Sequence, residues 1–166
     1  MFLKNYTSEV PVTQTLSRIE QALIRCGVSG ITKEYANTDG KIAAVTFNVQ
    51  MPGVKDVVIR LPANEEQALS TLWADYAGKD GISADGQHTN SSFKRKCRED
   101  FRQQAERTAW KLVQDWVEVQ MSLIQMKQAE WMQVFLPYVW DGRQTFYDRL
   151  KGEGFKGLPD PDRRER

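Results

Sequence analysis

Apolar side chains recur at helical spacing along the segment from residue 92 to residue 125, and this stripe constrains the fold more than any other feature of the chain. Its intervals of three and four residues place these side chains on one face of a single helix of roughly thirty residues. Such a helix is about 45 Å long at 1.5 Å per residue, so it must cover a sheet and still project beyond it. The stripe is formed by Phe101, Ala105, Thr108, Leu112, Trp116, Val119 and Leu123, and it is widened by Ala109, Val113, Val117 and Ile124.

Two shorter helical patterns precede the long helix. Residues 12–26 carry apolar side chains at intervals of three, four and three, which predicts an amphipathic helix. We expect Thr13 to cap this helix and Gly27 to end it, because glycine adopts a positive φ without a Cβ clash. Residues 64–77 predict a second amphipathic helix, which begins at the N-cap Asn64.

Between these two helices, residues 30–62 alternate apolar and polar side chains in three runs, as strands with one buried face do. Asp39-Gly40 and Pro52-Gly53 separate the runs, and both pairs are typical of tight turns. The chain order therefore predicts an α+β fold of the αβββα type. In this fold a three-stranded antiparallel sheet is packed by the first helix and by the long helix.

Residues 126–158 predict a helical extension to a core domain of residues 1–125, and residues 159–166 predict a disordered charged tail. We expect a bend near Lys127 and the end of a helix at Pro137, because proline cannot continue the hydrogen-bond ladder. The aromatic side chains of the extension need a surface to pack on, so we expect a homo-oligomer or docking on another protein. The candidate partner-binding residues are Trp131, Val134, Phe135 and Trp140.

Composition and motifs exclude several functional classes. Hydrophobic residues at 40% and charged residues at 27% are ordinary for a soluble globular protein, and no run of about 18 apolar residues predicts a membrane span. The first residues lack the apolar stretch of a secretory signal, so we expect a cytoplasmic protein in which Cys26 and Cys97 are free thiols. His88 has no ligand or nucleophile pattern around it, and no catalytic, metal or cofactor motif occurs. We therefore expect a protein that is not an enzyme.

Positive charge is concentrated at the start of the long helix, although the net charge of the chain is only +1. Residues 93–111 hold seven lysines and arginines against three acidic residues. Two interpretations stay open: a solvated helix end, or a grip on nucleic-acid phosphates that the glycine-rich loop of residues 78–92 joins on binding. The candidate phosphate ligands are Lys94, Arg95, Lys96, Arg98, Arg102, Arg107 and Lys111.

Two resemblances bear on these interpretations. The order of helix, three strands and helix resembles that of double-stranded-RNA-binding domains and of the related core of single-strand annealing proteins. In the former family, lysines at the start of the last helix straddle phosphates, which implies the same role for the cations of residues 94–98.

The segments ERTAWKLVQDWVEVQMSLIQ and EWMQVFLPYVWDGRQTFYDRL are similar to a pattern in small proteins of phages, prophages and plasmids, which implies a mobile-element setting. The pattern is carried by Trp110, Asp115, Trp116, Glu118, Gln120, Phe135, Leu136, Pro137, Tyr138, Asp141, Gly142, Arg143 and Tyr147.

Two functions therefore stay open. The first is a non-enzymatic protein of a phage or mobile element that binds single-stranded or duplex nucleic acid, for instance in recombination or replication. The alternative is a phage-encoded interaction protein that inhibits a host defence complex, as an anti-CRISPR-type inhibitor does. The five tryptophans fit either base stacking or core packing, and the positions of Trp73, Trp110 and Trp116 on apolar helix faces favour packing.

Overall fold

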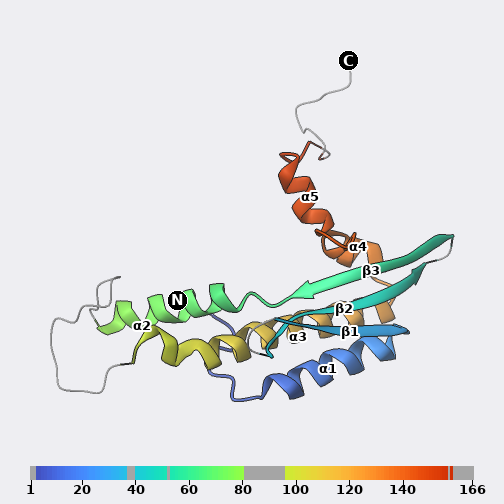
Figure 1. Cartoon of the computed structure of the whole chain (residues 1–166). Coiled ribbons are helices and arrows are strands. Elements are labelled where there is room, and N and C mark those ends of the chain that lie inside the picture. Colours follow the sequence, from blue (N-terminus) through green and yellow to red (C-terminus); the bar gives the residue numbers. More distant parts are fainter. Residues whose placement is uncertain (1–2, 37–39, 52, 81–95, 157, 159–166) are drawn as a thin grey trace. The chain divides into compact units, whose positions relative to one another are not determined.

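A computed structural model of the chain describes residues 3–36, 40–51, 53–80, 96–156 and 158 (Figure 1). These residues form a three-stranded antiparallel sheet with the strand order β1-β2-β3 and five α-helices, which confirms the predicted α+β fold. Within the described ranges, no helix has both the length and the hydropathy that crossing a bilayer requires.

Internal contacts divide the chain into two compact units that alternate along the sequence. Unit 1 comprises Met1–Cys26 and Pro62–Ser122, and unit 2 comprises Gly27–Leu61 and Leu123–Arg166.

Unit 1 is helical, and its helix ends follow local backbone chemistry. The prediction that Thr13 caps the first helix is wrong, because the carbonyl of Pro11 already accepts the first backbone hydrogen bonds and places Thr13 inside the helix. Gly27 follows the last turn with a φ of 86°, as predicted. The cap at Asn64 is confirmed, since its side chain accepts a hydrogen bond of 3.0 Å from the N–H of Gln67. The elements are α1 (Val12–Arg25), α2 (Glu65–Asp80), the 3₁₀ turn η1 (Arg98–Phe101) and α3 (Arg102–Gln125), whose last residues belong to unit 2.

One hydrophobic cluster of unit 1 joins α2 and α3. Leu69 and Leu72 of α2 form one buried cluster with Ala105 and Ala109 of α3. Phe101, at the end of η1, packs against this cluster and is itself only partly buried. Apolar contacts therefore join the start of α3 to α2 in addition to the ion pairs described below.

The helix α3 buries part of the face that its widened apolar stripe predicts, namely Ala105, Thr108, Ala109 and Val117, but leaves other residues of the stripe exposed or half-buried. It has 24 residues and is preceded by η1, so it is shorter than the single helix of roughly thirty residues that we expected. In its second half Val117 and Met121 are buried, whereas Val119 is 56% exposed. Trp110 and Gln114 are fully buried on the same face as Val117. Apolar residues occupy more than one side of this helix. The spacing of the apolar residues is therefore compatible with burial of the face of Val117 or of the face of Val119.

The sheet of unit 2 is an antiparallel meander. Gly40 and Gly53 have φ values of 65° and 78° between successive strands, a region that residues with a Cβ rarely adopt. In the central strand Val45, Phe47 and Val49 are buried and alternate with less buried residues, as predicted. The strands are β1 (Gly30–Tyr35), β2 (Ile42–Met51) and β3 (Val54–Pro62).

Residues that follow α3 pack on this sheet within unit 2. The predicted bend is confirmed, because α3 ends at Gln125 and Lys127 has a φ of 57°. Phe135 packs edge-on against Phe47 of β2 with ring centroids 5.5 Å apart, and Trp131 stacks on Phe135 at 5.6 Å. The aromatic side chains of this segment therefore extend the core of the sheet. The elements are α4 (Trp131–Phe135), the 3₁₀ turn η2 (Leu136–Tyr138), which contains Pro137, and α5 (Phe146–Gly152).

A chain of polar contacts crosses all three strands of the sheet. Glu34 of β1 accepts hydrogen bonds of 2.9 Å from the hydroxyl of Thr46 on β2 and from Nε of Arg60 on β3. The guanidinium of Arg60 also lies 4.9 Å from the ring centroid of Trp140. The backbone N–H of Trp140 donates a hydrogen bond of 2.8 Å to the backbone carbonyl of Val58. These contacts tie the residues after η2 to the edge strand β3.

Candidate binding site

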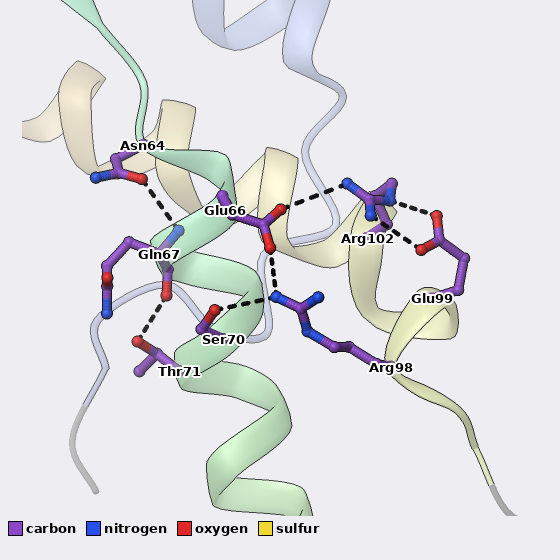
Figure 2. A network of polar contacts seen from close by, with 8 residues as sticks. All are labelled: Asn64, Glu66, Gln67, Ser70, Thr71, Arg98, Glu99 and Arg102. Carbon is purple, nitrogen blue, oxygen red and sulfur yellow. Dashed lines mark hydrogen bonds and ion pairs between the residues drawn. The ribbon is translucent and has the colours of Figure 1, made fainter. Parts of the chain in front are cut away.

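The basic residues at the start of α3 join this helix to α2 (Figure 2). The carboxylate of Glu66, in the first turn of α2, binds the guanidinium of Arg98 and lies 3.7 Å from Nη1 of Arg102. Arg98 also donates to the hydroxyl of Ser70 at 3.1 Å. Arg102 makes a second, two-pronged contact with Glu99, three residues earlier. Two of the candidate phosphate ligands thus come together at one junction, where they bind carboxylates of unit 1.

The other five candidate phosphate ligands differ in their surroundings. Lys111 lies 3.0 Å from a carboxylate oxygen of Asp115, and its side chain is only 18% exposed, so a phosphate has little access to it. Lys96 and Arg107 have no carboxylate partner in the part of the chain that the structure describes. Lys94 and Arg95 lie outside the described residues. The cations of this region therefore do not form one free basic surface along the described part of α3.

Asp115 fastens the N-terminal segment to the middle of α3. One of its carboxylate oxygens lies 2.7 Å from Nζ of Lys4 and accepts a hydrogen bond of 3.0 Å from the side-chain amide of Asn5. Its other oxygen binds Lys111. Burial raises the pKa of Asp115, but the three hydrogen bonds lower it by more, so its pKa falls from 3.8 to about 2. Asp115 is therefore ionised at neutral pH and holds three donors in place.

Two more residues of α3 continue this attachment. The side-chain amide of Gln104 donates to the carbonyl of Ser8 at 3.1 Å, and the hydroxyl of Thr108 donates to the carbonyl of Asn5 at 3.2 Å. Gln104, Thr108 and Asp115 are spaced by four and seven residues, so they lie on one face of the helix. This polar face fixes the path of the N-terminal segment along α3.

A cavity of about 490 Å³ opens between the N-terminal segment, α2 and η1, all within unit 1. Each of the three segments contributes one carboxylate to its lining, and these are Glu9, Asp75 and Asp100. Lys96 is the one basic residue among the lining residues. Binding pockets for small groups commonly measure roughly 300–1,000 Å³, so the cavity is large enough to hold a side chain. We call this cavity the acidic pocket.

Aromatic rings form one wall of the acidic pocket. The ring centroids of Tyr76 and Phe101 are 5.1 Å apart, and Trp73 lies behind them at 5.8 Å from Tyr76 and 6.1 Å from Phe101. The ammonium group of Lys96 lies 5.6 Å from the centroid of Phe101. The backbone N–H of Lys96 also donates to the hydroxyl of Tyr76 at 3.4 Å. Carboxylates beside electron-rich ring faces attract cations, and here an internal ammonium group already makes this contact.

The sequence patterns above did not single out the acidic pocket. Asp75 directly precedes Tyr76, and Asp100 directly precedes Phe101. These two pairs of an acidic and an aromatic residue are the sequence signal that could have indicated the pocket. Glu9 carries no comparable signal. Its place in the pocket depends on the attachment of the N-terminal segment through Gln104 and Asp115, which spacing within one helix does not reveal.

The candidate partner-binding residues of unit 2 lie in or beside its aromatic core. Phe135 is 0% exposed, so it contributes nothing to a surface, and the expectation that it awaits an external partner needs correction. Trp131 and Val134 are partly buried, and the Trp140 ring is covered on one side by Arg60. The sheet itself supplies the surface that the apolar pattern of this segment requires.

Other chemistry is sparse in the described residues. His88 lies outside them, and among them no group of three histidine, cysteine or acidic side chains is placed to hold a metal ion. Cys26 and Cys97 are not joined in a disulfide, as expected. A comparison of the chain with protein-family models, with curated proteins and with solved structures finds no match. The acidic pocket is therefore the feature of the described chain on which a function can be built.

Proposed function

We propose that the chain is a non-enzymatic protein-binding module that docks part of a partner protein in the acidic pocket of unit 1. The observation that carries the proposal is the pocket itself, in which three carboxylates and an aromatic wall from separate segments surround a space of about 490 Å³. The similarity of the 110–147 pattern to small phage proteins supports a host protein as the partner. Interaction therefore replaces nucleic-acid binding as the leading function.

The distribution of charge supports this order of the two functions. Around the α2–α3 junction, Arg98 and Arg102 share Glu66, and Arg102 also binds Glu99. A polyanion would have to compete with these carboxylates, and the acidic residues of the neighbouring pocket would repel its phosphates. A basic or neutral protein surface meets neither obstacle.

A pull-down from nuclease-treated bacterial extract tests the proposal. We expect the tagged chain to capture a stoichiometric protein, and the pocket variant Tyr6→Ala/Glu9→Lys to lose it. The matched control is Tyr35→Ala/Glu153→Lys, which changes the same residue types at exposed positions of unit 2 and should capture the protein as well as the wild type does. Capture that survives the pocket variant, or that disappears on nuclease treatment, contradicts the proposal.

Nucleic-acid binding is the second candidate, and the free cations favour it. Lys96 and Arg107 have no carboxylate partner among the described residues, and the pairs of Arg98 and Arg102 are partly exposed, so each is weak enough for a phosphate to replace it.

Binding of labelled single-stranded and duplex DNA and RNA at two salt concentrations tests this second candidate. If it holds, affinity falls with salt by a logarithmic slope of about −0.7 to −0.9 per neutralised phosphate. The variant Lys96→Glu/Arg107→Glu should then bind far more weakly than the control Arg18→Glu/Arg25→Glu, which reverses two exposed charges of α1. Equal affinities of the two variants would exclude a phosphate grip at the start of α3.

A further inference from the structure

We infer that the acidic pocket accepts a single lysine or arginine side chain of the partner, and that Lys96 occupies the position of this cation when no partner is bound. The inference deepens the proposed function and rests on it for the source of the cation, whereas the preference of the pocket for a cation stands on the structure of unit 1 alone. Three properties of the pocket carry it: its charge, its aromatic wall and the position of Lys96.

The charge of the pocket selects a cation. Glu9, Asp75 and Asp100 approach it from the N-terminal segment, from α2 and from η1, and Lys96 is the one basic residue among its described lining residues. Asp100 also accepts a hydrogen bond of 2.6 Å from the backbone N–H of Cys97, which restrains its carboxylate. An additional positive group is therefore favoured in the pocket, and an additional negative group is repelled.

The aromatic wall gives the cation a place to bind. Tyr76 and Phe101 are held at 5.1 Å by their packing on Trp73, so the wall is built before any partner arrives. Phe101 in addition packs against the core cluster of α2 and α3. Flat ring faces beside carboxylates bind ammonium and guanidinium groups more tightly than a hydroxyl or an alkyl group of the same size.

Lys96 shows that an ammonium group fits this wall. Its Nζ atom lies 5.6 Å from the ring centroid of Phe101, and the residue is exposed and without a carboxylate partner among the described residues. An exposed contact of this kind is weak, so the cation of a partner that also reaches Glu9 can displace it. Lys96 is therefore a competitor within the chain, and its removal should strengthen the binding of any external cation.

Titration with small cations, followed by amide shifts in NMR spectra, tests the inference without knowledge of the partner. The probes are n-butylammonium and n-butylguanidinium, with n-butanol as the neutral control. The variants are Lys96→Met, Glu9→Gln and the control Lys151→Met, which removes an equal charge from α5 in unit 2. The spectra themselves report whether each variant is folded.

We expect both cations to cause saturable shifts at the pocket residues and n-butanol to cause none. Lys96→Met should bind roughly two- to fivefold more tightly than the wild type, which corresponds to the loss of one exposed cation–π competitor. Glu9→Gln should bind more weakly, and Lys151→Met should match the wild type. Absence of saturable shifts, an equal response to n-butanol, or no gain with Lys96→Met would overturn the inference.

A peptide arm separates a protein source of the cation from a free small molecule. An acetylated five-residue glycine peptide with one central lysine should bind at least as well as n-butylammonium, and its norleucine counterpart should not bind. The outcome is independent of the pull-down. Capture of a partner without cation binding would contradict only this inference. Cation binding without capture of a partner would contradict only the proposed function.

Discussion

At the scale of single residues, the cations of this chain are best understood through the acids that they meet. Glu66 shows the principle, because its one carboxylate binds Arg98 and Arg102 and so links the first turn of α2 to the start of α3. The negative charge also suits the N-terminal end of α2, where the helix dipole favours anions. A cluster that looks like a phosphate grip in the sequence therefore has a structural use in the folded chain.

Replacement of Glu66 by glutamine tests this structural use. The change keeps the size of the side chain and removes its charge, so both arginines lose their shared partner. We expect the free energy of unfolding to fall by about 0.5 to 1 kcal/mol, because the ion pairs are exposed and screened by solvent. Urea denaturation measures the change, and Glu106→Gln, an equal change on α3 at a residue with no described partner, is the control. Equal losses in the two variants would rule out the link.

Asp115 makes the stability of unit 1 depend on pH. Its pKa of about 2 lies below the ordinary value of 3.8, so its contribution to stability is complete above about pH 4 and is lost as the pH falls toward 2. We expect Asp115→Asn to cost about 1 kcal/mol at pH 7, a value reduced by solvent screening on the side of the exposed Lys4. Thermal unfolding between pH 2 and pH 7 should show a smaller loss on acidification for this variant than for the wild type. The exposed control Asp56→Asn should retain the full loss.

At the scale of the elements, local sequence patterns predicted where helices and strands begin and end better than they predicted which face of a helix is buried. The strands, the glycine after α1 and the Asn64 cap follow from side-chain alternation and from backbone chemistry that neighbours in sequence supply. The buried face of α3 follows only in part, because apolar residues on several sides leave tertiary packing to choose between Val117 and Val119, which both belong to the predicted stripe. The acidic pocket was equally out of reach, since its lining joins segments that only the folded chain brings together.

A matched pair of valines checks the buried face of α3. Val117 is 0% exposed and Val119 is 56% exposed, so the same truncation to alanine has different consequences two residues apart on one helix. We expect Val117→Ala to lower the free energy of unfolding by about 2 kcal/mol, through lost burial and an unfilled cavity. Val119→Ala should change it by no more than about 0.5 kcal/mol. Denaturant unfolding of both variants measures these changes. A larger loss of stability in Val119→Ala than in Val117→Ala would contradict the assignment of the buried face.

At the scale of the whole molecule, the two units alternate along the chain and neither is continuous in sequence. The chain passes from one to the other after Cys26, after Leu61 and after Ser122, and the last of these points lies inside α3. Unit 2 in particular combines the three strands with the residues that follow α3. Its sheet therefore depends on side chains from a part of the sequence more than seventy residues further along.

A chain that ends at Gln125 tests this dependence. The truncation removes Phe135, which packs at 5.5 Å against Phe47, and it removes the hydrogen bond from Trp140 to the carbonyl of Val58. We expect the amides of β2 and β3 to exchange with solvent much faster than in the full chain, because the apolar face of the sheet loses its cover within unit 2. Hydrogen exchange followed by mass spectrometry measures the effect. The full chain with Phe135→Ala should show a smaller change in the same strands, and Leu136→Ala, at a residue that is 44% exposed, should show little. Unchanged strand protection after truncation would instead identify residues 126–158 as a separable extension, and would return their aromatic side chains to the role of an interaction surface.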